Sequence, residues 1–286
     1  MADICLICGA SRSRTVWHRG AAKIERCLGC GLLFTTERPV ENELMALYDG
    51  DLLIKSHFEP AAPIAIPVPE WKQEEHLQLL DGVARLGVRN GPLLDVGCFS
   101  GMFLANAKKR GFTVVGVEPN REAFLRLQNE LQMNVVHGSL SSARFPIDSF
   151  SVVAFLDVIE HVTDPVSELQ EAFRILRRGG VLVLSTPNVA GISQRIIQAK
   201  RRLFRQDWCP IDDVPWHLWG FTRSTLSRCV EKASFKVRRI MWLKPSLLTT
   251  NLGAGSSLAK RLGLRMLGEV SRPPHMSDRI ALFAQK

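Results

Sequence analysis

Two closely spaced pairs of cysteines are the residues of this chain whose spacing most directly predicts a chemistry. Cys5 and Cys8 form one C-x-x-C pair, and Cys27 and Cys30 form a second. Each short turn places both thiolates on one side, so the two pairs can close tetrahedrally around Zn²⁺. Four thiolates leave no open coordination position, and we therefore expect a structural zinc ion. Because a module of about 35 residues buries too little surface to fold alone, the metal should supply much of its folding free energy.

The segment between the cysteine pairs is basic and contains an aromatic residue. Residues 12–19 read R-S-R-T-V-W-H-R. Such a segment can contact nucleic acid, or it can form a solvated β-hairpin of a zinc ribbon on which Trp17 packs. We favour the hairpin, and we expect residues 1–40 to form a small zinc-binding ribbon.

A strand, a glycine loop, a helix and a second strand predict a ligand site further along the chain. P-L-L-D-V-G (92–97) is typical of a buried strand, G-C-F-S-G (97–101) is the loop, and the second strand ends at Glu118. Parallel strands joined by a helix bind ligands at their carboxyl ends, where Glu118 can accept both hydrogen bonds of a ribose diol. The loop lacks the G-x-G-x-x-G fingerprint of dinucleotide sites. Asp95 would repel a pyrophosphate and suits a cationic ligand instead.

These two segments, L-L-D-V-G-C-F-S-G and V-V-G-V-E-P, resemble motifs I and II of the class I S-adenosylmethionine-dependent methyltransferases. Three later segments agree with that family, at 145–165, 176–188 and 217–226. The resemblance runs from about residue 70 to the end, and the four-cysteine module ahead of it is similar to that of the sugar C-methyltransferases. It implies an enzyme of the α/β class, with a Rossmann-like seven-stranded sheet and S-adenosylmethionine as cofactor.

The motifs and the strand ends together indicate which residues face the cofactor. We expect contacts from Asp95, Gly97, Cys98, Gly101, Glu118, Pro119, Ser139, Leu140 and Asp157. Two positions depart from the family pattern, because Phe99 replaces a second glycine and Ser139 replaces an aspartate near the adenine.

The segment D-V-I-E-H, which follows the strand at 152–157, carries the first candidates for catalysis. His161 could act as a general base with a pKa near neutrality. Alternatively, Asp157, Glu160 and His161 could bind a divalent cation, a pattern that resembles the ubiquinone-pathway O-methyltransferases. A third interpretation is that these residues line the cofactor pocket and precede a helix that begins near Asp164. His217 is a second candidate base.

The remaining segments predict the domain organisation. We expect a linker and helical cap over 41–90, with a proline-rich stretch at 59–69 and a helix over 70–86, and a methyltransferase domain over 91–286. An insertion at about 189–220 combines a basic amphipathic helix with Trp208, Trp216 and Trp219. The helix could grip a phosphorylated substrate or lie on a membrane, and the tryptophans could wall a substrate pocket or form the core of a lid. The last two strands should form an antiparallel hairpin, with a short helix within 245–275.

The composition favours one chemical class of binding partner but does not identify a particular partner. The net charge of +9 and the isoelectric point of about 9.5 favour anionic partners, although excess basic residues can also simply keep a surface solvated. The sequence has no apolar run of membrane-spanning length and no signal-peptide pattern, so we expect a cytoplasmic protein. We expect methyl transfer to a small molecule, with a sugar or sugar nucleotide favoured. The alternatives are an RNA methyltransferase that uses the basic ribbon and, less favoured, a non-catalytic binding module.

Overall fold

The computed structural model describes residues 4–20, 22–40, 43, 44, 46, 48, 70–204, 209–211, 214, 216–243 and 277–286. Three features predicted above lie outside these residues: the proline-rich stretch at 59–69, the helix within 245–275 and Trp208.

The strands and helices follow the predicted order. The strands are β1 (Ser13–Arg19), β2 (Ala22–Cys27), β3 (Leu33–Thr35), β4 (Gly91–Val96), β5 (Phe112–Glu118), β6 (Val135–His137), β7 (Phe150–Leu156), β8 (Leu176–Pro187), β9 (Trp219–Gly220), β10 (Lys236–Trp242) and β11 (Arg279–Gln285). The helices are α3 (Glu70–Arg85), α4 (Met102–Lys109), α5 (Arg121–Asn129), α6 (Pro165–Ile175), α7 (Ile192–Leu203) and α8 (Arg223–Lys232).

Seven strands form the main sheet in the order β10-β11-β8-β7-β4-β5-β6. Strands β4 to β8 are parallel to one another, whereas β11 runs antiparallel to both β8 and β10. The predicted Rossmann-like seven-stranded sheet is therefore confirmed, as is the antiparallel hairpin at the end of the chain. The carboxyl ends of β4, β5 and β7 meet at one edge of the sheet, which is where such sheets bind ligands.

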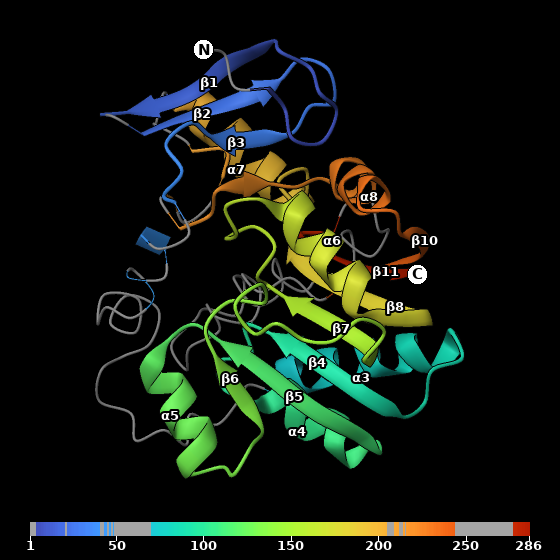
Figure 1. Cartoon of the computed structure of the whole chain (residues 1–286). Helices are drawn as coiled ribbons and strands as arrows, with labels where there is room; N and C mark the ends of the chain where they lie inside the picture. The colour runs from blue at the N-terminus through green and yellow to red at the C-terminus, as the bar shows by residue number, and fades with distance from the viewer. Residues whose placement is uncertain are drawn as a thin grey trace, which may run out of the picture.

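Side-chain alternation along the strands divides the core between the two faces of the sheet. On β4, Leu94 and Val96 pack in one buried cluster and Leu93 in the other, as expected for a strand covered on both sides. Helices α6 and α8 contact each other and cover one face, while α3 and α4 do the same on the opposite face (Figure 1).

Local capping signals explain where three of the helices begin. The side chain of Asn120 accepts a hydrogen bond from the Ala123 N–H at the start of α5. Asp164 caps α6 just before Pro165, and Thr222 caps α8 with a capping box. These short polar side chains satisfy backbone donors that a helix leaves without a partner, and all three were recognisable in the sequence.

The N-terminal ribbon lies at one pole of the molecule (Figure 1) and its sheet contains a strand that the sequence did not predict. Strands β1 and β2 form the expected antiparallel hairpin, and β3 pairs with β2. The fourth strand, β9, comes from residues 219–220 at the end of the insertion. The ribbon and the insertion are thus joined in one sheet. Among the described residues, no helix is both long enough and apolar enough to cross a membrane.

Candidate functional site

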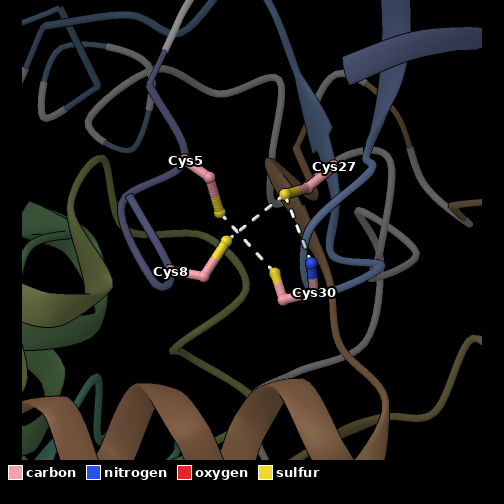
Figure 2. Close-up of side chains that lie close together, drawn as sticks. All are labelled: Cys5, Cys8, Cys27 and Cys30. Atoms are coloured by element: carbon pink, nitrogen blue, oxygen red, sulfur yellow. Dashed lines mark hydrogen bonds between the residues drawn. The ribbon is translucent and has the colours of Figure 1, made fainter. Parts of the chain in front are cut away.

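The four cysteines of the ribbon converge, and their sulfur atoms point toward one another in Figure 2. The Sγ atoms of Cys5 and Cys30 are 3.7 Å apart, and those of Cys8 and Cys27 are 3.5 Å apart. Tetrahedral coordination at a Zn–S distance of about 2.3 Å separates the sulfurs by about 3.8 Å. None of these cysteines forms a disulfide, so the donor set and its dimensions fit a zinc ion.

Backbone groups around the cysteines add to that fit. The N–H groups of Gly29 and Cys30 donate to the Sγ of Cys27, at 3.3 and 3.5 Å. Such bonds stabilise a thiolate and orient it toward a metal. Cys5 and Cys27 are also buried in the same cluster as β4 and β7 of the main sheet. The ribbon therefore packs on the larger domain rather than standing apart from it.

Two glycines of the loop after β4 occupy positions that no other residue could take without strain. Gly97 and Gly101 have φ angles of +69° and +70°. A Cβ on Gly97 would lie 2.7 Å from the Val158 side chain. The Cys98 side chain points under the loop, because a Cβ on Gly116 would lie 2.5 Å from its Sγ. Only the backbone of Cys98 could therefore face a ligand above the loop.

Replacing Gly101 with alanine is expected to lower the free energy of unfolding by about 2–4 kcal/mol. The new Cβ would lie 2.5 Å from a Leu127 methyl group and 2.6 Å from the Met133 sulfur, in a left-handed backbone conformation. Gly111 offers a matched control, since its φ is +91° but no atom lies within 4 Å of the Cβ position. Gly111→Ala should cost only about 1 kcal/mol of backbone strain. Urea denaturation of both variants checks this, and equal losses would mean that Gly101 is needed only for its φ.

Glu118 at the end of β5 holds the loop through backbone hydrogen bonds. Its Oε2 accepts from the Phe99 N–H and its Oε1 from the Asn120 N–H, both at 2.8 Å. Burial raises the pKa of Glu118 to about 7, although these two donors act in the opposite direction. Burial also raises the pKa of the neighbouring Asp95, as does the charge of Glu118, while Lys72 lowers it. Two buried carboxyl groups beside a glycine loop suit a ligand with hydroxyl and cationic groups.

The turn after β6 holds the residues predicted to lie near an adenine. Ser139 caps this turn, because its Oγ accepts from the Ser142 N–H at 3.2 Å. Leu140 is buried in the core cluster on the α6 side of the sheet. The carbonyl of Pro119 lies 3.0 Å from the Nε2 of His137, which ties the end of β5 to the end of β6. The proposed cofactor contacts of these three residues stay predictions.

Asp157 lies at the carboxyl end of β7, with a positive φ of +59°. Arg279 donates to both of its carboxylate oxygens, and the Nζ of Lys72 lies 2.9 Å from Oδ2. Burial alone would raise the pKa of Asp157, but the charges of Arg279 and Lys72 hold it well below its usual value. Arg279 and Lys72 also pair with the buried Glu75, at 2.8 and 3.0 Å. Asp157 is therefore an ionised member of a four-residue network.

Glu160, His161 and His217 form a second cluster beside this network. One ligand-type atom from each residue lies within 4.8 Å of the others. Glu160 is 1% exposed, and neither of its carboxylate oxygens has a hydrogen-bond partner among the described residues. Burial raises the pKa of Glu160 to about 8, and the charge of Asp157 adds to the effect. The sequence predicted a cation-binding set of Asp157, Glu160 and His161. The structure instead brings His217, and not Asp157, together with Glu160 and His161.

The geometry of His161 suits a proton acceptor. Its Nδ1 lies 3.1 Å from the Trp216 carbonyl, and a neutral ring must donate there, which leaves Nε2 unprotonated. The His161 and His217 rings meet edge to face, with centroids 4.6 Å apart. A carboxylate next to two imidazoles can hold a proton or a divalent cation.

Three polar residues near the two clusters, the buried His76 and Arg279 and the half-buried Tyr48, were not predicted from the sequence. His76 on α3 has no hydrogen-bond partner for Nδ1 among the described residues, and burial together with the Lys72 charge lowers its pKa to about 3. Tyr48 accepts a hydrogen bond from the Asn120 side chain at its carbonyl, at 2.5 Å. Burial, Glu160 and Glu118 all raise the pKa of Tyr48. Arg279, which binds Asp157 and Glu75, is the third polar residue that the sequence did not predict. Polar residues within apolar helix and strand patterns were the only sequence signal.

The insertion divides between core and surface. Trp219 is 2% exposed, packs against Phe34 and donates its indole N–H to the Val162 carbonyl. Trp216 is half-buried, with its ring 6.4 Å from that of Tyr48. On α7, Ile196 and Leu203 are 44% and 78% exposed, so the predicted apolar side of this helix is not covered by the described core.

A family model described as "Methyltransferase domain" matches residues 71–240, which is more than half of the chain. A ubiquinone biosynthesis O-methyltransferase of Psychrobacter cryohalolentis is 29% identical over 37% of this chain and 44% of its own length. A probable S-adenosylmethionine-dependent methyltransferase of Mycolicibacterium smegmatis is 32% identical over 51% of this chain and 52% of its own length. The chain thus spans about half the length of these curated relatives.

Solved structures share the fold at low sequence identity. The geranyl diphosphate C-methyltransferase of Streptomyces coelicolor has a TM-score of 0.56 at 15% identity, over 87% of this chain and 98% of that one. A SAM-dependent methyltransferase of Archaeoglobus fulgidus has a TM-score of 0.52 at 19% identity, over 76% of this chain and 96% of that one.

Proposed function

This chain belongs to the methyltransferase domain family, and we propose that it transfers the methyl group of S-adenosylmethionine to a small molecule. The observation that carries this proposal is the pairing of Glu118 with the glycine loop. Glu118 at the end of β5 accepts a hydrogen bond from the Phe99 N–H, in the loop that ends β4. Two adjacent parallel strands thereby present a carboxylate and a close-approach loop at one edge, as a ribose and a cationic amino acid group require.

When bound, S-adenosylmethionine supplies an activated methyl group on its sulfonium, so the protein needs mainly to position the acceptor. Glu118 would hold the ribose hydroxyls, and the backbone of Gly97 to Gly101 would line the methionine end. Asp95 and the Ser139–Leu140 turn would complete the pocket. These roles rest on the burial and strand positions of the residues.

The cluster of Glu160, His161 and His217 would remove a proton from the acceptor. His161 would accept that proton at Nε2, because the Trp216 carbonyl fixes its Nδ1–H. Glu160 and His217 lie within 4.8 Å of one another and of His161 at their ligand-type atoms, where Glu160, once ionised above its raised pKa of about 8, can stabilise the imidazolium. Asp157, held by Arg279, lies between this cluster and α3 and contributes negative charge near a cationic cofactor.

The acceptor that we favour is a sugar or a sugar nucleotide. The four-cysteine module resembles that of the sugar C-methyltransferases, and the net charge of +9 suits a phosphorylated substrate. Trp216 and Tyr48, close to the cluster, offer aromatic surface for stacking. The ubiquinone biosynthesis O-methyltransferases among the relatives are named for methyl transfer to oxygen, so a compound with acceptor hydroxyl groups is the class to compare.

Transfer of labelled methyl from S-adenosylmethionine tests this proposal. The purified protein is incubated with sugar nucleotides, a catechol and transfer RNA in parallel. We expect label in a sugar nucleotide, at a rate that changes little between 50 and about 200 mM salt, whereas RNA binding would weaken about 10³-fold or more. Label in RNA with that salt dependence would replace the small-molecule acceptor, and label in the catechol would replace the sugar.

We also propose that Cys5, Cys8, Cys27 and Cys30 hold one structural zinc ion. Their Sγ separations of 3.5 and 3.7 Å support this assignment. Elemental analysis of the purified protein should give one zinc per chain, and Cys27→Ser should reduce that ratio. Full zinc content in the Cys27→Ser protein would contradict the assignment.

A further inference from the structure

We propose that the four-cysteine ribbon is a positioning device for the proton-accepting cluster, acting through the segment Trp216–Gly220. This inference rests on the proposed function, because the cluster accepts a proton only in methyl transfer. The coupling between the ribbon and the cluster can be tested separately. It assigns to the ribbon a role beyond its own folding: it holds the acceptor side of the site in place.

The ribbon binds one edge of this segment through strand pairing. Strand β9 pairs antiparallel with β3, with Leu33 opposite Gly220 and Phe34 opposite Trp219. The Thr35 N–H donates to the Leu218 carbonyl at 3.0 Å. Because β3 also pairs with β2, which ends at the metal-ligand candidate Cys27, one continuous ladder joins the cysteine cluster to residues 218–220.

The same segment binds residues 160–162 on its other side. The N–H groups of Leu218 and Trp219 both donate to the Glu160 carbonyl, at 2.8 and 3.2 Å. The Trp219 indole donates to the Val162 carbonyl at 2.7 Å. The Trp216 carbonyl lies 3.1 Å from the Nδ1 of His161. His217 lies between these anchors, so each residue of the cluster is bonded to this segment or belongs to it.

Side chains of the ribbon reinforce the link. Trp219 packs against Phe34 with ring centroids 6.3 Å apart. The guanidinium of Arg38 lies over the Trp219 ring, 4.8 Å from its centroid. A cation over a buried indole is attracted to the ring face, and this attraction fixes the orientation of the indole. Arg38 is therefore a positioning residue whose effect reaches Glu160 through Trp219.

The proposed cofactor side has its own strand pairing, although β4 shares a buried cluster with Cys5 and Cys27. Glu118 and the glycine loop belong to β4 and β5, whose pairing partners are each other, β6 and β7. A ribbon of this size depends on its metal for folding. Loss of zinc should therefore release residues 216–220 and the cluster while leaving the cofactor side folded.

Hydrogen–deuterium exchange of the full chain, with zinc bound and after treatment with a zinc chelator, tests the coupling. We expect the Leu218 and Trp219 amides to exchange at least about tenfold faster without zinc, together with the ribbon. Amides of β4 should stay protected, and calorimetry should give the same affinity for S-adenosylhomocysteine within about twofold. Unchanged protection at Leu218 and Trp219, with the ribbon amides unprotected, would overturn the proposal. Simultaneous loss of protection in β4 would overturn it as well.

A milder change avoids unfolding the ribbon. Arg38→Ala, with zinc bound, should speed exchange at the Leu218 and Trp219 amides by about fivefold, and Arg38→Lys should restore most of the protection. Arg14→Ala is the matched control, because it removes an exposed arginine from β1, the edge strand farthest from β9. Equal effects of Arg14→Ala and Arg38→Ala would overturn the role of Arg38. If zinc-loaded protein fails to bind S-adenosylhomocysteine but shows these exchange changes, the proposed function fails and the coupling stands.

Discussion

Replacing Arg279 with methionine is expected to lower the free energy of unfolding by about 3–5 kcal/mol. Arg279 is 4% exposed and joins two carboxylates, at 2.8 Å from Glu75 and in direct contact with Asp157. Methionine keeps much of the apolar volume but removes the charge. Both carboxylates would then share Lys72 alone, and the Glu75 carboxylate, whose side chain is 3% exposed, would lose its Arg279 partner while it stays desolvated.

Arg110→Met is the control for that variant. Arg110 pairs with Asp81 at 2.8 Å, but the two side chains are 43% and 50% exposed. Exposed pairs contribute about 0–1 kcal/mol, so this change should be small in urea denaturation. Equal effects of Arg279→Met and Arg110→Met would contradict the view that the ion pair of Arg279 with Glu75 is buried and coupled to Asp157.

Replacing Glu160 with glutamine is expected to slow methyl transfer by about 10²–10⁴-fold while leaving cofactor affinity unchanged. Glutamine has nearly the same shape, but it cannot ionise above about pH 8 as Glu160 does, and it therefore cannot balance a protonated His161. Single-turnover kinetics, with the acceptor that the labelling experiment identifies, measures the transfer step directly. Glu130→Gln, at a side chain that is 61% exposed on the surface, is the control and should not change the rate. Full activity of Glu160→Gln would exclude the cluster from proton transfer.

The same variant has a stability signature that depends on pH. The folded-state pKa of Glu160 is raised to about 8, from an ordinary value of 4.5. The folded protein then binds a proton that the unfolded chain has lost between these values, so stability falls as pH rises from about 5 to 8. Glu160→Gln should flatten this fall, because glutamine does not titrate. Asp157, whose pKa is lowered, acts with the opposite sign and only in acid.

The parts of this protein that the sequence predicted are those encoded by short spacings. The two C-x-x-C pairs predict a cluster because each pair is one turn. Asp164, directly before Pro165, predicts a helix start because a cap acts within three residues. The strand–loop–strand pattern predicts the position of Glu118 because adjacent parallel strands end at one edge.

The parts that were missed depend on contacts between distant segments. Arg279 reaches Asp157 across 122 residues, and Lys72 reaches it across 85. No spacing rule links such residues, and a basic residue at the start of a strand is ordinary until its partner is known. Strand β9 is two residues long and pairs with β3 at the other end of the chain. A strand this short has no periodicity to detect.

Calorimetric titration of the zinc-loaded protein with S-adenosylmethionine and S-adenosylhomocysteine, with Glu118→Ala beside the wild type, tests the central claim most directly. We predict micromolar binding of both ligands to the wild type. Glu118→Ala should weaken it about a hundredfold, through loss of two charge-assisted hydrogen bonds, whereas Glu122→Ala, on the exposed side of α5, should not. Absence of binding to the wild type at millimolar ligand, or equal binding by Glu118→Ala, would contradict a cofactor site at the ends of β4 and β5.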